Sequence, residues 1–150
     1  MVLIDGVESF DQAANSLVAI VKITPESPFF VTSGEFVGVG GERNAGGVPS
    51  WVAIEYMAQT AAALVCRLEH VENPDAPSKP GLLLGTRRLA LDLPRFEEGS
   101  TYHVSALRVY SDALAAAFDC KITDDGGREV ATAVLNAYRP DDFSSFLSSL

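Results

Sequence analysis

The sequence is poor in the residues that build metal and redox sites, with two cysteines and two histidines among 150 residues. Cys66 and Cys120 show neither metal nor redox spacing, so we expect both to be buried free thiols. Without clustered ligands, we expect no metal and no other cofactor. Basic residues are also few, and the net charge of −9 argues against binding nucleic acid, because that needs a basic excess.

The patterns of a membrane segment and of a signal peptide are also missing. Apolar runs are too short or too interrupted to cross a bilayer, and the first residues lack a charged region and a cleavage site. We therefore expect a cytoplasmic protein. A length of 150 residues, 47% of them hydrophobic, predicts a single globular domain over residues 1–150.

One apolar stretch, from Val48 to Leu68, predicts a single helix over about residues 49–71. Its only charged residue before position 67 is Glu55, and Gln59 lies one turn later on the same face. A helix that is apolar nearly all round is normally buried, so we expect both side chains to enter a core. Because an unpaired buried carboxylate is costly, Glu55 is the candidate functional residue.

The rest of the chain has the pattern of strands. Apolar and polar residues alternate, with turn residues between the runs, over residues 15–24, 81–93, 101–110, 113–123 and 129–138. Asp124-Asp125-Gly126-Gly127 predicts a hairpin, and the residues after Pro140 have the spacing of a short amphipathic helix. Strands that follow one buried helix indicate an α+β fold, with an antiparallel sheet wrapped around that helix.

A long glycine-rich loop over residues 29–47 precedes the helix, and loops of this length are often functional. It lacks the Lys-Ser or Lys-Thr of a Walker loop and the βαβ context of a dinucleotide fingerprint. Phosphate binding is therefore disfavoured.

The helix carries a recognisable motif. P-S-W-V-A-I-E-Y-M-A-Q, over residues 49–59, resembles the P-G-V…E-x-x-A-Q segment of hotdog-fold 3-hydroxyacyl-acyl-carrier-protein dehydratases. Together with L-L-G-T-R-R-L at residues 83–89, it is similar to the dehydratase-like proteins of aryl-polyene biosynthetic clusters. The resemblance implies a hotdog fold, a homodimer or heterodimer with sites at the subunit interface, and thioesters of an acyl carrier protein or coenzyme A as substrates.

The resemblance also implies roles for individual residues. Glu55 matches the family's catalytic acid, and Gln59 matches the polar residue beside it. Ser50 stands where the family has a glycine whose backbone N–H polarises the thioester carbonyl, and Trp51 follows it at the helix N-terminus. Asn44, in the preceding loop, is a further candidate for substrate binding.

The sequence departs from the family at the catalytic histidine. Its place falls on Gly41, and no histidine precedes His70. His70 lies about 22 Å along the helix from Glu55, at about 1.5 Å per residue, which is too far within one subunit. His103 lies in a predicted strand, where an ordinary half-exposed side chain is favoured over a catalytic one.

Three functions stay open. The chain is an active dehydratase with its base from elsewhere, a hotdog thioesterase whose carboxylate activates water, or a non-catalytic acyl-binding subunit paired with an active dehydratase. The resemblance also implies an acidic carrier protein, so its docking patch must be locally basic. Arg87, Arg88 and Arg95, with Arg43, are the candidates, and ordinary surface arginines are the alternative.

Overall fold

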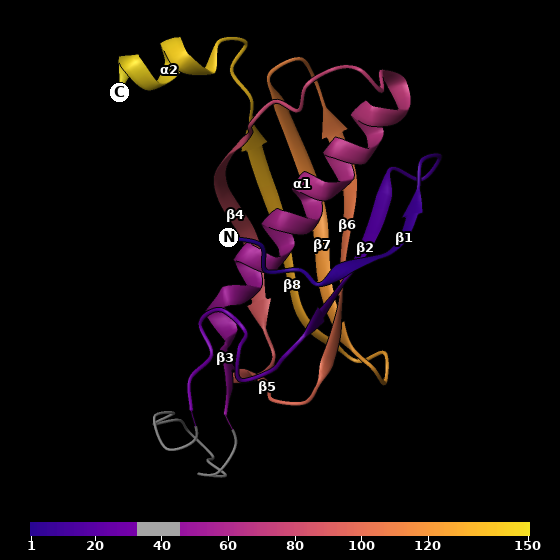
Figure 1. Cartoon of the computed structure of the whole chain (residues 1–150), viewed down its shortest axis with the longest axis vertical. Coiled ribbons are helices and arrows are strands. Elements are labelled where there is room, and N and C mark those ends of the chain that lie inside the picture. Colours follow the sequence, from indigo (N-terminus) through magenta and orange to yellow (C-terminus); the bar gives the residue numbers. More distant parts are fainter. Residues whose placement is uncertain (33–45) are drawn as a thin grey trace.

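In the computed structural model, which describes residues 1–32 and 46–150, an antiparallel sheet wraps around one long helix (Figure 1). The six strands of this sheet, within the described residues, have the order β1-β2-β6-β7-β8-β4, and every pair of neighbours is antiparallel. Their bounds are β1 Gly6–Asp11, β2 Ser16–Lys22, β4 Leu82–Leu91, β6 Thr101–Ser111, β7 Ala115–Asp124 and β8 Glu129–Tyr138.

The remaining elements are short, apart from the central helix. They are β3 Gly47–Pro49, β5 Arg95–Glu97, the 3-10 turn η1 Ser50–Val52, the helix α1 Ala53–Glu72 and the helix α2 Phe143–Ser149. β3 and β5 pair with each other outside the main sheet. The predicted helix, the five predicted strands and the short C-terminal helix are all confirmed, whereas β1, β3 and β5 were not predicted.

The core lies between α1 and the concave face of the sheet. Alternate residues of β6 point toward the helix, so Tyr102 and Val104 are buried whereas His103 faces outward. From the other side α1 contributes Met57 and Leu64, both fully buried, and it packs on β2, β6, β7 and β8. Burying a side chain of this size contributes roughly 1.5–3 kcal/mol, so this face holds the helix in place.

The opposite face of α1 corrects one prediction. The helix is not buried all round, because the sheet covers only one of its sides. Glu55 and Cys66 lie on the other side and are exposed in the single chain, so the predictions that they are buried are wrong for this chain alone. Cys120, on β7, is buried as predicted, and burial raises the pKa of its thiol to about 12.

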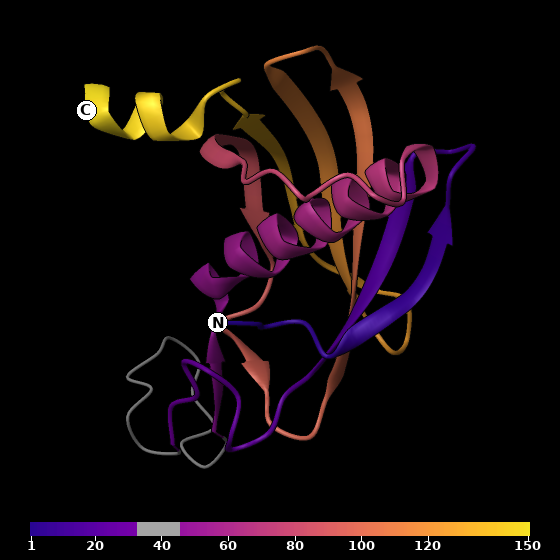
Figure 2. The same ribbon diagram turned by 45° about the horizontal axis from the view of Figure 1, so that its top comes forward.

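The two ends of the chain lie on different parts of the molecule. The N-terminal residues cross the outer side of α1, and α2 extends beyond β4, the edge strand of the sheet (Figures 1 and 2). Among the described residues, no helix is long and apolar enough to span a membrane.

Candidate functional site

The first turn of α1 is held in place by the small sheet and by an aromatic cluster beneath it. Gly47 on β3 lies so close to β5 that an added Cβ would be 2.2 Å from the Phe96 carbonyl oxygen, so only glycine fits there. Phe96 packs edge-on against Tyr56 of α1, at 5.3 Å between ring centres, and against Tyr102 of β6, at 4.9 Å. These contacts fix where Ser50 and the start of α1 lie.

Neither buried tyrosine is a candidate base. Burial raises the pKa of Tyr56, which is next to Glu55 in the sequence but points into the core. Burial also raises the pKa of Tyr102, whose hydroxyl accepts a hydrogen bond from the Glu97 backbone N–H at 3.0 Å. Both rings therefore act as packing groups.

Glu55 and Gln59 lie together on the outer face of α1, as their spacing predicts. The Gln59 Nε2 donates to Glu55 Oε1 at 3.4 Å, a long hydrogen bond. Glu55 is in the first turn of α1, directly after the η1 turn that contains Ser50 and Trp51. The structure thus brings these four predicted site residues to one end of one helix.

Gln59 has further partners that sequence reasoning missed. Its Oε1 accepts a hydrogen bond from the Leu3 backbone N–H at 2.7 Å, and its Nε2 donates to the Met1 carbonyl oxygen at 3.0 Å. The Leu3 side chain is buried in the core. Through these two hydrogen bonds, Gln59 holds the N-terminal residues against the outer side of α1, one turn from Glu55. No local signal could have revealed this, because the partners are more than fifty residues apart.

Neither histidine of the chain lies near Glu55. His70 is exposed near the C-terminal end of α1. His103 faces outward from β6, on the side of the sheet away from the helix, as expected of an ordinary strand residue. The catalytic base that the family's chemistry needs is thus not a histidine of this chain acting in its own subunit.

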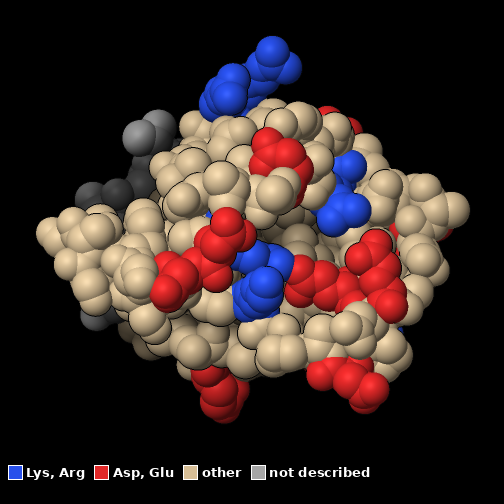
Figure 3. All heavy atoms as spheres, turned by 90° about the horizontal axis from the view of Figure 1, so that it is seen from above, with Lys and Arg blue, Asp and Glu red and all other residues tan. Residues whose placement is uncertain are grey.

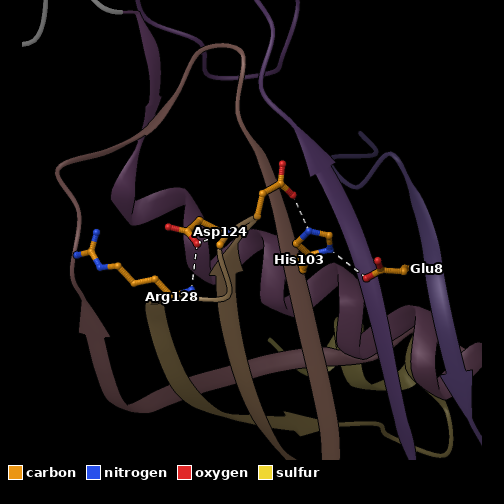
Figure 4. A network of polar contacts seen from close by, with 6 residues as sticks. Glu8, His103, Asp124 and Arg128 are labelled. Atoms are coloured by element: carbon orange, nitrogen blue, oxygen red, sulfur yellow. Dashed lines mark hydrogen bonds and ion pairs between the residues drawn. The ribbon is translucent and has the colours of Figure 1, made fainter.

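His103 instead links β6 to two other parts of the sheet, as Figure 4 shows. Its Nε2 lies 2.8 Å from Asp125 Oδ1 in the β7–β8 turn, and its Nδ1 lies 3.0 Å from Glu8 Oε2 on β1. Hydrogen bonds to Asp125 and to Glu8 raise the pKa of this imidazole. The carboxylates bind opposite ring nitrogens, so the three groups do not converge on one ion.

The arginines predicted to contact a carrier protein lie on two different strands, and two further predicted residues lie outside the described part of the chain. Arg87 and Arg88 are exposed on β4, whereas Arg95 on β5 is half-buried. At the centre of the face seen from above, basic side chains are flanked by acidic ones, whereas other basic side chains stand apart at the upper edge of that view (Figure 3). Asn44 and Arg43, with most of the glycine-rich loop, lie outside the described residues.

Neither of two hollows in the described part of the chain lies at Glu55. The wider one, of about 940 Å³, is open and is lined by Ser9, Phe10, Asp11, Gln12, Ala13 and Ser16. A groove of about 470 Å³ lies between the C-terminal half of α1 and the connector to β4, lined by Ala63, Cys66, Arg67, Glu69, His70, Ala76 and Ser78. Its helical residues begin two turns beyond Glu55. In the described part of the chain, then, Glu55 lies on an open surface.

Several solved structures share this architecture. A chain of the dehydratase heterocomplex ApeI:P from Xenorhabdus doucetiae is 25% identical with a TM-score of 0.76, over 98% of this chain and 88% of that one. A hypothetical thioesterase from Streptococcus pneumoniae, solved with coenzyme A, is 14% identical with a TM-score of 0.61, over 89% of this chain and 84% of that one. The E. coli PaaI protein, from the phenylacetic acid degradation operon, is 13% identical with a TM-score of 0.58, over 89% and 78%.

These similarities confirm the hotdog fold that the helix motif implied. Among curated proteins, none matches the chain in sequence. The model of the ApeP-like family, described as ApeP dehydratase, matches residues 1–148. Since this match spans nearly the whole sequence, the chain belongs to the ApeP-like dehydratase family.

Proposed function

We propose that the chain is one subunit of a cytoplasmic hotdog dehydratase that acts on 3-hydroxyacyl thioesters of an acyl carrier protein, in fatty-acid or aryl-polyene biosynthesis. Family membership supports the reaction class. The observation that carries the proposal is that Glu55 and Gln59 lie together in the first turns of the central helix, directly after the η1 turn that contains Ser50 and Trp51. A dehydratase needs an acid beside donors for a thioester carbonyl, and in our proposal Glu55 and the backbone amides of this turn take these roles.

The proposed chemistry assigns one role to each group. A base removes the C2 proton, the electron pair forms the C2–C3 double bond, and the C3–O bond breaks. Glu55 protonates the leaving hydroxyl, which departs as water. The backbone N–H groups of Ser50 and Trp51, at the start of the helix, donate to the thioester oxygen as negative charge develops on it. Gln59 positions the protonated carboxyl group of Glu55 by donating its Nε2–H to Oε1.

The base comes from a second subunit in this proposal. Neither histidine of the chain lies near Glu55, and Glu55 is exposed in the single chain. Pairing with another hotdog subunit along the open edge of β4, as a homodimer or a heterodimer, would bring new side chains to this surface and exclude water from it. The similarity to a chain of the ApeI:P heterocomplex supports such a partner.

Two other functions fit specific observations. With an exposed carboxylate and no nearby histidine, Glu55 would suit a thioesterase in which it activates water, releasing a free thiol from an acyl thioester. The heterocomplex similarity equally suits a non-catalytic acyl-binding subunit whose partner does the chemistry. The enoyl product, a free thiol and the effect of Glu55→Gln in the presence of a partner together separate the three functions.

The assay is incubation of the full chain with a 3-hydroxyacyl carrier protein, followed by mass spectrometry of the carrier and by thiol detection. Our proposal predicts loss of one water to give the enoyl carrier protein, without free thiol. Thiol release would instead establish the thioesterase. Silence in both measurements, relieved by adding a histidine-containing hotdog dehydratase, would indicate a mixed enzyme. If Glu55→Gln then abolishes the restored enoyl formation, this chain supplies the acid. If Glu55→Gln restores enoyl formation as well as the wild type does, the chain is the non-catalytic subunit.

The carrier-protein surface can be tested separately. We propose that Arg87 and Arg88, exposed on β4, contact the acidic carrier with help from Arg95. Replacing Arg87 and Arg88 by Glu should weaken carrier binding at low salt, whereas Lys121→Glu, exposed on β7, should change it little. Equal binding by the double variant and the wild type would exclude these arginines.

A further inference from the structure

Residues 1–3, which we call the strap, lie across the outer side of α1 (Figures 1 and 2). Leu3 inserts its side chain into the core, whereas the side chains of Met1 and Val2 are mostly exposed. Shortly after the strap, the backbone N–H of Asp5 donates to a carbonyl oxygen of β2 at 2.8 Å and so joins the chain to the sheet. The strap is therefore anchored at its end, and its backbone crosses α1 at Gln59.

The carboxamide of Gln59 binds the strap through both of its polar atoms. Its Oε1 accepts from the Leu3 N–H at 2.7 Å, and its Nε2 donates to the Met1 carbonyl oxygen at 3.0 Å. A carboxamide nitrogen carries two N–H groups, so a second one is left for Glu55, whose Oε1 lies 3.4 Å from Nε2. One orientation of the carboxamide thus serves all three contacts.

The strap determines which polar atom of Gln59 faces Glu55. A carboxamide beside a carboxyl group can take either orientation, because its oxygen suits a protonated carboxyl group and its nitrogen suits an ionised one. Reversing the carboxamide would bring its Oε1 against the Met1 carbonyl oxygen and its Nε2 against the Leu3 N–H, and both hydrogen bonds to the strap would be lost. The strap therefore favours the orientation that presents an N–H to Glu55.

This orientation matters for a group that acts as an acid. An N–H that donates to Oε1 of Glu55 occupies that oxygen as an acceptor, so the proton of the neutral carboxyl group resides on Oε2. A reversed Gln59 would instead accept this proton in a hydrogen bond and compete for it with a leaving hydroxyl. The contact is long in the single chain, and hydrogen bonds of catalytic groups often tighten only when substrate is bound.

We propose that the strap is a positioning element for Glu55: by binding both polar atoms of Gln59, it keeps the carboxamide N–H directed at Oε1 and leaves the proton of the acid on Oε2. The inference rests on the proposed function, in which Glu55 protonates the leaving hydroxyl. It adds a role for the main chain of residues 1–3, which acts through Gln59. The alternative is a strap that only stabilises the fold, so the test has to separate the two effects.

The test removes one backbone N–H and keeps every side chain. The α-hydroxy acid analogue of leucine is incorporated at position 3, so that an ester oxygen replaces the Leu3 N–H. Enoyl formation is measured over a range of 3-hydroxyacyl carrier protein concentrations, with a histidine-containing hotdog dehydratase added if the chain alone is silent. We expect kcat to fall by about tenfold and KM to change by less than about twofold, because a misplaced acid affects the reaction more than binding.

The matched control is the α-hydroxy acid analogue of isoleucine at position 4. It makes the same exchange in the backbone one residue later, and it keeps both the Leu3 N–H and the Met1 carbonyl oxygen that Gln59 binds. This variant should keep kcat within about twofold of the wild type. An equal loss of kcat from the esters at positions 3 and 4 would contradict a specific role of the Leu3 N–H.

A double-mutant cycle with Glu55→Gln separates positioning from stability. The ester at position 3 should lower the enoyl rate by about tenfold in the wild-type background and by less than about twofold in Glu55→Gln, which has no carboxyl proton to position. An equal fall in both backgrounds would overturn the inference and leave the strap a structural element. A wild-type rate in Glu55→Gln alone would instead overturn the proposed function, on which the inference rests.

The orientation of Gln59 can be measured without any activity. In ¹³C,¹⁵N-labelled wild-type protein, scalar couplings across hydrogen bonds identify which nitrogen donates to which carbonyl group. We expect one coupling between the Leu3 amide nitrogen and the Gln59 side-chain carbonyl carbon, and another between Gln59 Nε2 and the Met1 carbonyl carbon. A reversed carboxamide or a detached strap would give neither coupling, and that result would overturn the proposal.

Discussion

The attachment of the N-terminal residues to α1 by Gln59 gives a sharp prediction for Gln59→Ala. The variant removes the hydrogen bonds to the Leu3 N–H, at 2.7 Å, and to the Met1 carbonyl, at 3.0 Å. At about 1 kcal/mol each, their loss costs about 2 kcal/mol of unfolding free energy. If the segment then detaches, exposing Leu3 adds roughly 1.5–3 kcal/mol, which brings the total to about 3.5–5 kcal/mol.

The prediction is measured by urea titration and by hydrogen exchange of the Leu3 amide. For a domain of this size, a loss of 2 kcal/mol lowers Tm by about 4–8 °C. The matched control is Gln12→Ala, at an exposed turn between β1 and β2, which should change stability by less than about 0.5 kcal/mol. Wild-type stability in Gln59→Ala, together with unchanged exchange of the Leu3 amide, would refute this role of Gln59.

A second variant at this position distinguishes the hydrogen bond that Gln59 accepts from the one that it donates. Gln59→Glu keeps an acceptor for the Leu3 N–H but lacks the N–H that donates to the Met1 carbonyl, and it places a second carboxylate beside Glu55. We therefore expect a loss of stability that is larger at high pH than well below pH 4, where carboxyl groups are largely protonated. A loss of equal size at both pH values would contradict this account of Gln59.

Three further predictions concern the core and the sheet. Leu64→Ala, on the fully buried face of α1, should lower the free energy of unfolding by about 2–5 kcal/mol in urea titration, and an unchanged midpoint would mean that α1 does not pack there. Ellman's reagent should modify Cys66 alone in the native protein, because burial raises the pKa of Cys120 to about 12, and reaction of both thiols before unfolding would contradict that burial. The raised pKa of His103 means that its ion pairs stabilise the fold below pH 6.5 and that this contribution is lost as pH rises through the raised value. The stability lost in His103→Gln, at most about 1 kcal/mol for exposed pairs, should therefore be larger at pH 5.5 than at pH 8.5, and equal losses would exclude the effect.

Periodicity explains which parts of the fold could be predicted. The alternation of Tyr102, Val104 and Ala106 with outward residues is local, so one sequence suffices to place β6 and its buried face. The apolar pattern that predicts the long helix is equally local. By contrast, β3 and β5 have three residues each, which is too few for any alternation to show.

Burial of the helix could not be predicted from its composition alone. Glu55 and Cys66 are exposed because the sheet covers one side of α1, and the sequence does not say how many sides are covered. The composition of the helix alone does not distinguish an apolar outer face from a face that packs in the core. In our proposal, that face is apolar because a second subunit covers it.

The candidate site was predicted in part. The spacing of Glu55 and Gln59 placed them together, and the motif pointed to the start of the helix. The partners of Gln59 are distant in sequence, so only the folded chain shows that it holds the residues at Met1 and Leu3. The role of Asn44 stays a prediction, because that residue lies outside the described part of the chain.

The most direct test of the central claim is Glu55→Gln in the carrier-protein assay, with Glu72→Gln, an exposed acid at the far end of the same helix, as the matched control. Glu55→Gln keeps the shape and hydrogen-bonding capacity of the side chain but cannot supply the proton to the leaving hydroxyl. We predict that Glu72→Gln forms the enoyl product at the wild-type rate and that Glu55→Gln loses at least about 100-fold, since positioned acid catalysis is typically worth 10²–10⁴-fold. Enoyl formation by Glu55→Gln at the wild-type rate would contradict the claim.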